Sequence, residues 1–203
     1  MRLIRPNKTE FLALFGPDVK SIWICTPWVS TEGVRYLREG LDKTSPTCLR
    51  EIELWIRLNS RDYELGLSDY ICLAELMEEL ADRVPDLKFS IWSSDNLHAK
   101  FFVTDRGALL GSCNLTWAGF ENNIELAVRL EPKEVFDQLS LRDVMRTDLE
   151  QVTTNDWKDF VHGLNKASRS SVAEAAVGKD GSWESFIQGL LVEGPPHLKT
   201  HLR

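Results

Sequence analysis

The sequence predicts an α/β protein in which helices flank a β-sheet, followed by a helical C-terminal appendage. Short apolar alternations of period two recur through the first part of the chain, and amphipathic patterns of period 3.6 lie between them. The chain has 203 residues, and a chain of this length can bury a full hydrophobic core without disulfides. We therefore expect one α/β domain over residues 1–132 and an appendage over residues 133–203.

Strand-like and helix-like segments follow one another along the first domain. The clearest strand pattern spans residues 51–58, where Ile52, Leu54 and Ile56 share one face. Apolar residues that recur every three or four positions predict helices over residues 32–41 and 68–81. The predicted strands are 21–25, 51–58, 87–92, 99–104, 108–110 and 123–130.

The appendage carries two more amphipathic helical patterns, around residues 157–164 and 183–191. The turn Gly178-Lys179-Asp180-Gly181 separates them, and Pro195-Pro196 ends the second. Two interpretations are open for their apolar stripes, docking on the α/β domain or a dimer or partner surface. We favour docking, because such stripes usually belong to a protein core.

Composition and charge narrow the possible functions. The chain has 24 Lys and Arg against 31 Asp and Glu, a net charge of −7, which argues against indiscriminate nucleic-acid binding but allows a local basic site. No apolar run is long enough for a secretory signal or a membrane span. The cysteines lack zinc-binding spacing, so we expect free thiols in a reducing cytoplasm. They are Cys25, Cys48, Cys72 and Cys113.

One stretch gathers residues suited to chemistry. His98 and Lys100 are two positions apart in a predicted strand, so both side chains leave the same face of the sheet. Ser112 and Asn114 have the same spacing after the next short strand, and Glu125 falls on the polar face of the strand that follows. Three neighbouring segments can therefore bring these five side chains to one point.

This pattern resembles the phospholipase D superfamily, whose signature is HxK(x)4D followed closely by GSxN. Here the first part is His98-x-Lys100-(x)4-Asp105 and the second is Gly111-Ser112-x-Asn114. Five residues separate Asp105 from Gly111, one fewer than usual, and a turn should tolerate that shortening. The resemblance covers roughly residues 15–132, includes the opening strand with Thr26-Pro27-Trp28, and implies a mixed sheet.

The resemblance implies a metal-independent phosphodiesterase that forms a phosphohistidine on His98 and needs no cofactor. Lys100 and Asn114, assisted by Ser112, would stabilise the phosphoryl oxygens, and Glu125 would orient the imidazole. No carboxylate cluster suited to Mg²⁺ is present in the sequence. Asp105 belongs to the motif, but strand alternation turns it away from His98, which favours a structural role.

The family uses two histidines, and this chain has one copy of the motif. His162, His197 and His201 lack the surrounding Lys and Asn, so the resemblance implies a homodimer with one shared site. Trp117 could stack on a base and Arg57 could hold a phosphate, while core packing and a solvated loop are their structural alternatives.

The leading hypothesis is a cytoplasmic endonuclease, with DNA favoured over RNA, in the manner of a restriction or defence nuclease. A phospholipase or phosphatidyl transferase would use the same chemistry but is disfavoured, because the sequence has no basic amphipathic helix or anchor. The second alternative is a catalytically idle scaffold, against which the intact motif argues.

Overall fold

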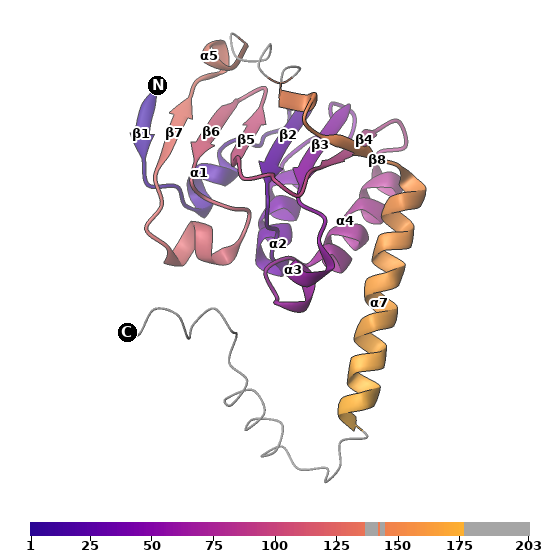
Figure 1. Cartoon of the computed structure of the whole chain (residues 1–203). Helices are drawn as coiled ribbons and strands as arrows, with labels where there is room; N and C mark the ends of the chain where they lie inside the picture. The colour runs from indigo at the N-terminus through magenta and orange to yellow at the C-terminus, as the bar shows by residue number, and fades with distance from the viewer. Residues whose placement is uncertain (137–141, 143–144, 177–203) are drawn as a thin grey trace, which may run out of the picture. The chain divides into compact units, whose positions relative to one another are not determined.

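A mixed β-sheet of eight strands organises the chain, in the order β1-β7-β6-β5-β2-β3-β4-β8 (Figure 1). This computed structural model describes residues 1–136, 142 and 145–176. Strands β2, β3 and β4 run parallel to one another, and every other pairing is antiparallel. The strands are β1 (Arg2–Ile4), β2 (Ser21–Thr26), β3 (Glu51–Ile56), β4 (Lys88–Ser93), β5 (Phe101–Thr104), β6 (Gly107–Gly111), β7 (Ala127–Leu130) and β8 (Glu150–Val152).

Helices α1, α2 and α4 lie along one face of the sheet (Figure 1). The ring of Phe11 in α1 lies 5.1 Å from those of Phe102 in β5 and Phe120, which fixes the face that α1 covers. The helices are α1 (Lys8–Leu12), α2 (Thr31–Leu41), α3 (Ser60–Glu64), α4 (Tyr70–Arg83), α5 (Pro132–Phe136), α7 (Thr154–Ala176) and a short π-helix, η1 (Ala118–Asn122).

Aromatic side chains cover the other face of the sheet. Trp23 packs edge-on against Trp55 and Phe101, with ring centroids 4.8 and 4.2 Å away. The partly buried side chains of Met145 and Leu149 pack against this cluster. Residues 145–149 therefore cover part of this face.

A buried carboxylate anchors that covering segment. Glu53 in β3 is 1% exposed and accepts hydrogen bonds from the Nε1 of Trp55 (2.6 Å) and from the guanidinium groups of Arg142 and Arg146. Burial raises the pKa of Glu53, but the hydrogen bonds from the two arginines outweigh it and lower the pKa overall. The carboxylate is thus charged and is held by Trp55 of β3 and by two arginines from outside the sheet.

The chain divides into two compact units, Met1–His162 and Gly163–Arg203. The sheet itself continues beyond residue 132, because β8 pairs with β4 as an edge strand. Strand β8 has only three residues, and they are mostly exposed, so the sequence shows no apolar alternation that would predict it. In the first unit, Phe160 lies 5.2 Å from the ring of Tyr70 in α4, consistent with docking of the first amphipathic stripe.

Several sequence predictions change in extent. The strand predicted from residue 99 begins at Phe101, because Pro27 follows β2 and cannot continue the ladder. The strand predicted from residue 123 begins at Ala127. Ile124 and Leu126, which that strand would place on the apolar face opposite Glu125, are 99% and 57% exposed. The helix predicted around 183–191 lies outside the described residues. Of the described helices, none is long and apolar enough to cross a membrane.

Candidate active site

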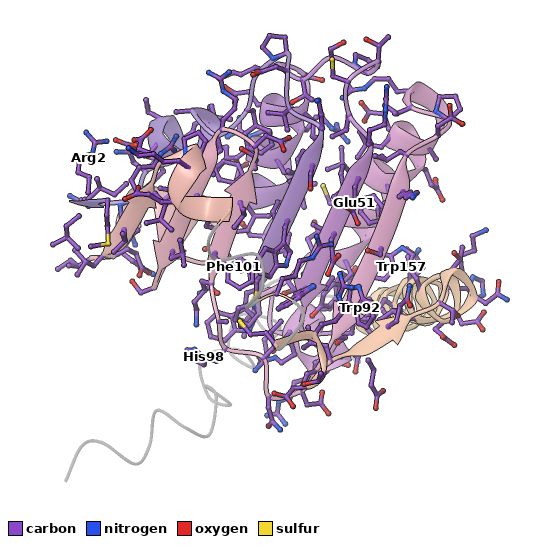
Figure 2. All side chains as sticks on the ribbon, turned by 90° about the horizontal axis from the view of Figure 1, so that it is seen from above. Arg2, Glu51, Trp92, His98, Phe101 and Trp157 are labelled. Atoms are coloured by element: carbon purple, nitrogen blue, oxygen red, sulfur yellow. The ribbon has the colours of Figure 1, made fainter. Side chains whose placement is uncertain are left out.

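Three chain segments meet at one end of the sheet. Lys100 directly precedes Phe101, the first residue of β5, which pairs with Cys25 of β2. Gly111, the last residue of β6, donates its backbone N–H to the carbonyl of Lys100 (3.2 Å). Figure 2 shows His98 beyond Phe101, past the end of the strands. The two halves of the motif are therefore neighbours in space.

Direct contact joins the two motif residues His98 and Lys100. The Nζ of Lys100 lies 2.5 Å from the Nδ1 of His98 and 2.6 Å from its carbonyl oxygen. An ammonium group has only donors, so this contact assigns the acceptor role to Nδ1 of the imidazole. Both side chains precede β5 instead of lying within it, yet they reach the same point.

Burial lowers the pKa of Lys100 below that of an ordinary lysine, because the charged ammonium loses solvent. The nearby charge of Arg57 lowers this pKa as well, whereas the charge of Glu125 opposes the shift. Charges of both signs thus act on the ammonium of Lys100.

Glu125 is bound to Ser112. The Oγ of Ser112 donates a short hydrogen bond to Oε2 of Glu125 and accepts one from the N–H of Leu126 (3.2 Å). The Nδ2 of Asn123 donates to the other carboxylate oxygen (3.2 Å). In this arrangement Lys100 occupies Nδ1 of His98 and Ser112 and Asn123 occupy the carboxylate of Glu125, so the orienting role of Glu125 stays a prediction.

Asn114 lies beside the carboxyl end of β2. Its Oδ1 is 3.4 Å from the Oγ1 of Thr26, a fully buried hydroxyl that donates to the carbonyl of Trp28 (2.9 Å) and accepts from the N–H of Leu115 (3.1 Å). The hydroxyl of Thr26 thus ties the GSxN segment to the loop after β2.

A tight hairpin between β5 and β6 accommodates the short spacing of five residues between Asp105 and Gly111. Thr104 pairs with Gly107, so only two residues form the connection. Gly107 has a φ of +130°, which a side chain would strain. Gly111 lies so close to β7 that a Cβ there would be 2.2 Å from the carbonyl oxygen of Leu126. Gly107 therefore permits the tight turn, and Gly111 permits the close approach of the two strands just before Ser112.

Asp105 lies at the far end of β5 from His98. Its Oδ2 accepts hydrogen bonds from the backbone N–H groups of Lys20 (2.6 Å) and Ser21 (2.9 Å). Since a strand advances about 3.3 Å per residue, Asp105 is roughly 17 Å from Lys100 along the chain. The motif aspartate, grouped with the site by sequence, instead holds the start of β2 to the hairpin.

Two cysteines lie next to the site and are unsuited to nucleophilic attack. Burial raises the pKa of both Cys25 and Cys113 to about 12. The Sγ of Cys25 donates to the carbonyl of Ala99 (3.3 Å). All four cysteines are free, as the sequence predicts.

The two predicted substrate contacts, Trp117 and Arg57, differ in their surroundings. Trp117 is 49% exposed and so is not a core residue. Arg57 forms a bidentate ion pair with Asp62 at 2.7 and 2.8 Å and lies over the ring of Trp28. Its loop is therefore ordered by a side-chain contact that the sequence does not reveal.

A pocket of about 640 Å³ opens beside His98. Its walls combine apolar groups from the aromatic face with polar groups from the segment before the motif. Among the described residues, no group of three or more His, Cys, Asp or Glu side chains could hold a metal ion. The pocket is lined by Trp55, Ser94, Asn96, Leu97, His98, Ala99, Met145, Asp148 and Leu149.

Thr26 and Ser30 support the site and were missed in the sequence. The Oγ of Ser30 caps α2 by accepting from the N–H of Gly33, and it accepts the N–H of Trp117 as well, both at 3.2 Å. A threonine at the end of an otherwise apolar strand is a weak signal for Thr26. Ser30 before a helical pattern predicts a cap, but not the contact with Trp117.

Comparisons with solved structures find similar folds at low sequence identity. The phosphatidylserine synthase of Haemophilus influenzae matches with a TM-score of 0.54 and 17% identity, over 83% of this chain and 43% of that protein. Nuc from Salmonella typhimurium, a phospholipase D family member, matches with a TM-score of 0.47 and 16% identity, over 71% of this chain and 89% of Nuc. NucT from Helicobacter pylori matches with a TM-score of 0.46 and 14% identity, over 70% of this chain and 87% of NucT.

A comparison with curated proteins finds no match. The family described as "Cardiolipin synthase, PLD-like domain" matches residues 18–142, which is more than half of the chain and includes every motif residue from His98 to Glu125. The chain, with its mixed sheet and flanking helices, therefore belongs to the phospholipase D superfamily.

Proposed function

We propose that this protein is a metal-independent phosphodiesterase that cleaves nucleic acid, most simply DNA, through a covalent phosphohistidine. The observation that carries the proposal is the contact between the ammonium of Lys100 and the imidazole of His98 at the end of the sheet. An imidazole nucleophile with a cation beside it suits attack on a phosphodiester.

In the first step, Nε2 of His98 attacks phosphorus and the bond to the leaving oxygen breaks. For Nε2 to have a free electron pair, Nδ1 must carry the ring proton, so the Nζ of Lys100 must move from Nδ1 to a phosphoryl oxygen. The carboxylate of Glu125 then stabilises the imidazolium-like ring, in the role that the family resemblance gives it. Water attacks phosphorus in the second step and releases the histidine.

Lys100 and Asn114 stabilise the negative charge that gathers on the phosphoryl oxygens, with Ser112 holding Glu125 in place. Their positions on neighbouring segments support this division of roles. The high pKa of Cys25 and Cys113 supports a histidine nucleophile, since neither thiol ionises near neutral pH.

The leaving oxygen needs a proton from a second histidine, and we infer that the His98 of a second copy supplies it. A homodimer with a two-fold axis through the phosphate would place the two imidazoles on opposite sides. Ile124 and Leu126, the neighbours of Glu125 in the sequence, are exposed apolar residues and support coverage of this region by a second copy. Two Lys100 groups then meet in an otherwise acidic protein.

Nucleic acid is the favoured substrate, and a phospholipid is the alternative. The pocket beside His98 has room for a group next to the phosphate, and its mixture of apolar and polar walls suits a nucleoside. The exposed apolar residues near Glu125 would also suit a lipid surface. Free cysteines support a reducing cytoplasm, where a restriction or defence nuclease would act.

The test is incubation with DNA, RNA, phospholipid vesicles and bis(p-nitrophenyl) phosphate in EDTA. Phosphodiesterase activity should persist in the chelator, and His98→Ala should abolish it. His162→Ala is the matched control, because His162 is exposed and lies apart from the motif. Activity that vanishes in EDTA and returns with Mg²⁺ or Zn²⁺ would overturn the metal-independent mechanism. Hydrolysis of phospholipid but not of DNA or RNA would overturn the proposal that nucleic acid is the substrate.

A further inference from the structure

Arg57 stands at the same end of the sheet as the motif residues. It directly follows Ile56, the last residue of β3, and Ile56 pairs with Thr26 at the end of β2. Thr26 in turn contacts Asn114 of the motif. Arg57 is therefore one strand away from the segment that carries Asn114.

Two contacts hold the guanidinium of Arg57 in one orientation. Its Nε and Nη2 donate to the two carboxylate oxygens of Asp62, which is only 5% exposed. Its plane lies over the ring of Trp28, with 5.4 Å from Cζ to the ring centroid. Trp28 is itself tied to Thr26 through its carbonyl oxygen. The orientation of Arg57 is thus linked to the site through short contacts.

The held guanidinium keeps donors for another group. An arginine has five N–H donors, and Nη1 of Arg57 makes no hydrogen bond to any part of the chain that the structure describes. The side chain is 23% exposed, so it is reachable from solvent. The charge of Arg57 also contributes to lowering the pKa of Lys100, in agreement with their places at the same end of the sheet.

We propose that Arg57 binds the phosphate next to the scissile one, and therefore that the substrate is a nucleic-acid strand with phosphates on both sides of the cut. This inference rests on the proposed function. In the shared-site dimer, two-fold symmetry gives one Arg57 on each side of the scissile phosphate. A planar guanidinium held at a fixed angle suits a phosphate oxygen better than a mobile lysine would.

The experiment measures binding of a fluorescein-labelled single-stranded 20-nucleotide DNA by anisotropy, in EDTA, on His98→Ala protein so that nothing is cut. The test variant adds Arg57→Gln and Asp62→Asn together, which keeps the net charge and leaves no unpaired buried carboxylate. Affinity should fall about tenfold, and the slope of log K against log salt should become shallower by about 0.7 for each phosphate that the variant no longer binds.

The matched control adds Arg61→Gln and Glu64→Gln in helix α3, where both side chains are exposed. This pair also conserves the net charge, and it should leave affinity and slope unchanged. Equal behaviour of the two pairs, or a loss of affinity with an unaltered slope in the test pair, would overturn the proposal. Thermal unfolding followed by circular dichroism checks that the test pair is folded.

Two further arms separate this inference from the proposed function. Wild-type kcat/KM is measured on the 20-nucleotide strand and on bis(p-nitrophenyl) phosphate, which has one phosphate. The paired Arg57 and Asp62 change should cost at least about tenfold more on the strand. Equal losses would overturn the flanking-phosphate role, whereas absence of His98-dependent hydrolysis of either substrate would overturn the proposed function. If the paired Arg57 and Asp62 variant lost binding to phosphatidylglycerol vesicles but kept its binding to DNA, the inference would also be overturned.

Discussion

The ammonium of Lys100 lies 2.5 Å from Nδ1 of His98, so the two motif residues hold each other in place. A neutral imidazole that accepts at Nδ1 carries its proton on Nε2. Attack by Nε2 therefore requires that a bound phosphate first draw Lys100 away from the ring. Substrate binding and the correct imidazole tautomer are coupled through a single side chain.

The alkaline limit of activity should report on Lys100. Its pKa is lowered by burial, and catalysis needs the charged form. On bis(p-nitrophenyl) phosphate, whose nitrophenolate can leave without a proton from the second histidine, kcat/KM should therefore fall above the pKa of Lys100. The fall should begin at a lower pH than the ordinary lysine pKa. In Lys100→Arg the rate drops, but the limit should move to higher pH, because a guanidinium stays charged. An unchanged limit in a pH profile of kcat/KM would contradict this assignment.

Replacing Glu125 by Gln should slow turnover without abolishing it. The amide cannot offset a positive imidazole, and it weakens the hydrogen bond from Ser112, so we expect a loss of about 100-fold in kcat. Glu125→Asp should recover part of the rate because it restores the charge. Steady-state kinetics on a single substrate checks the order, and a loss as complete as that of His98→Ala would assign Glu125 a larger role.

Asp105→Asn should affect stability more than catalysis. Its carboxylate accepts two backbone N–H groups at the start of β2, and an amide retains one good acceptor, so about 1 kcal/mol of unfolding free energy should be lost. Urea denaturation measures the free energy, and activity is compared per folded molecule. A folded Asp105→Asn protein as inactive as His98→Ala would show that the far end of β5 takes part in the chemistry.

Mixed dimers test the shared site. If one site needs two copies of His98, a heterodimer of wild-type and His98→Ala chains should have little or no turnover. Equal mixing with full exchange should then reduce turnover per wild-type chain to about half, since only wild-type pairs remain active. Differently tagged chains allow the heterodimer to be isolated. A fully active chain that sediments as a monomer at assay concentration would refute the arrangement.

Local patterns in the sequence predict much of this fold, and contacts between distant residues account for what they miss. Alternation locates β3, and the motif brings His98, Lys100, Ser112 and Asn114 to one end of the sheet. The contacts of Asp105 with Lys20 and Ser21 place it at the other end of β5 from His98, and strand alternation does not account for this separation, because His98 precedes β5.

Ion pairs between distant segments give no local signal. Glu53 accepts a hydrogen bond from Arg146, which is 93 residues away in the sequence. The residues around Glu53 or around Arg146 therefore do not predict that residues 145–149 cover the aromatic face. The exposure of Ile124 and Leu126 was missed because an alternating pattern predicts burial whether or not a strand forms. Arg57 and Asp62 are only five residues apart, but this spacing matches neither the helical nor the strand period. The sequence pattern therefore does not predict their ion pair.

The position of β5 beside β2 has a consequence for how the protein acquires its site during folding. The strands β3 and β4 lie between them in the chain, so Phe101 meets Cys25 only after a long loop has closed. Such non-local pairing forms slowly compared with the local hairpin of β5 and β6. A fragment that starts after β3 would contain every motif residue from His98 to Glu125, yet it would lack the surface against which Lys100 and Asn114 are aligned. The site therefore depends on a pairing between distant segments that the hairpin of β5 and β6 alone does not supply.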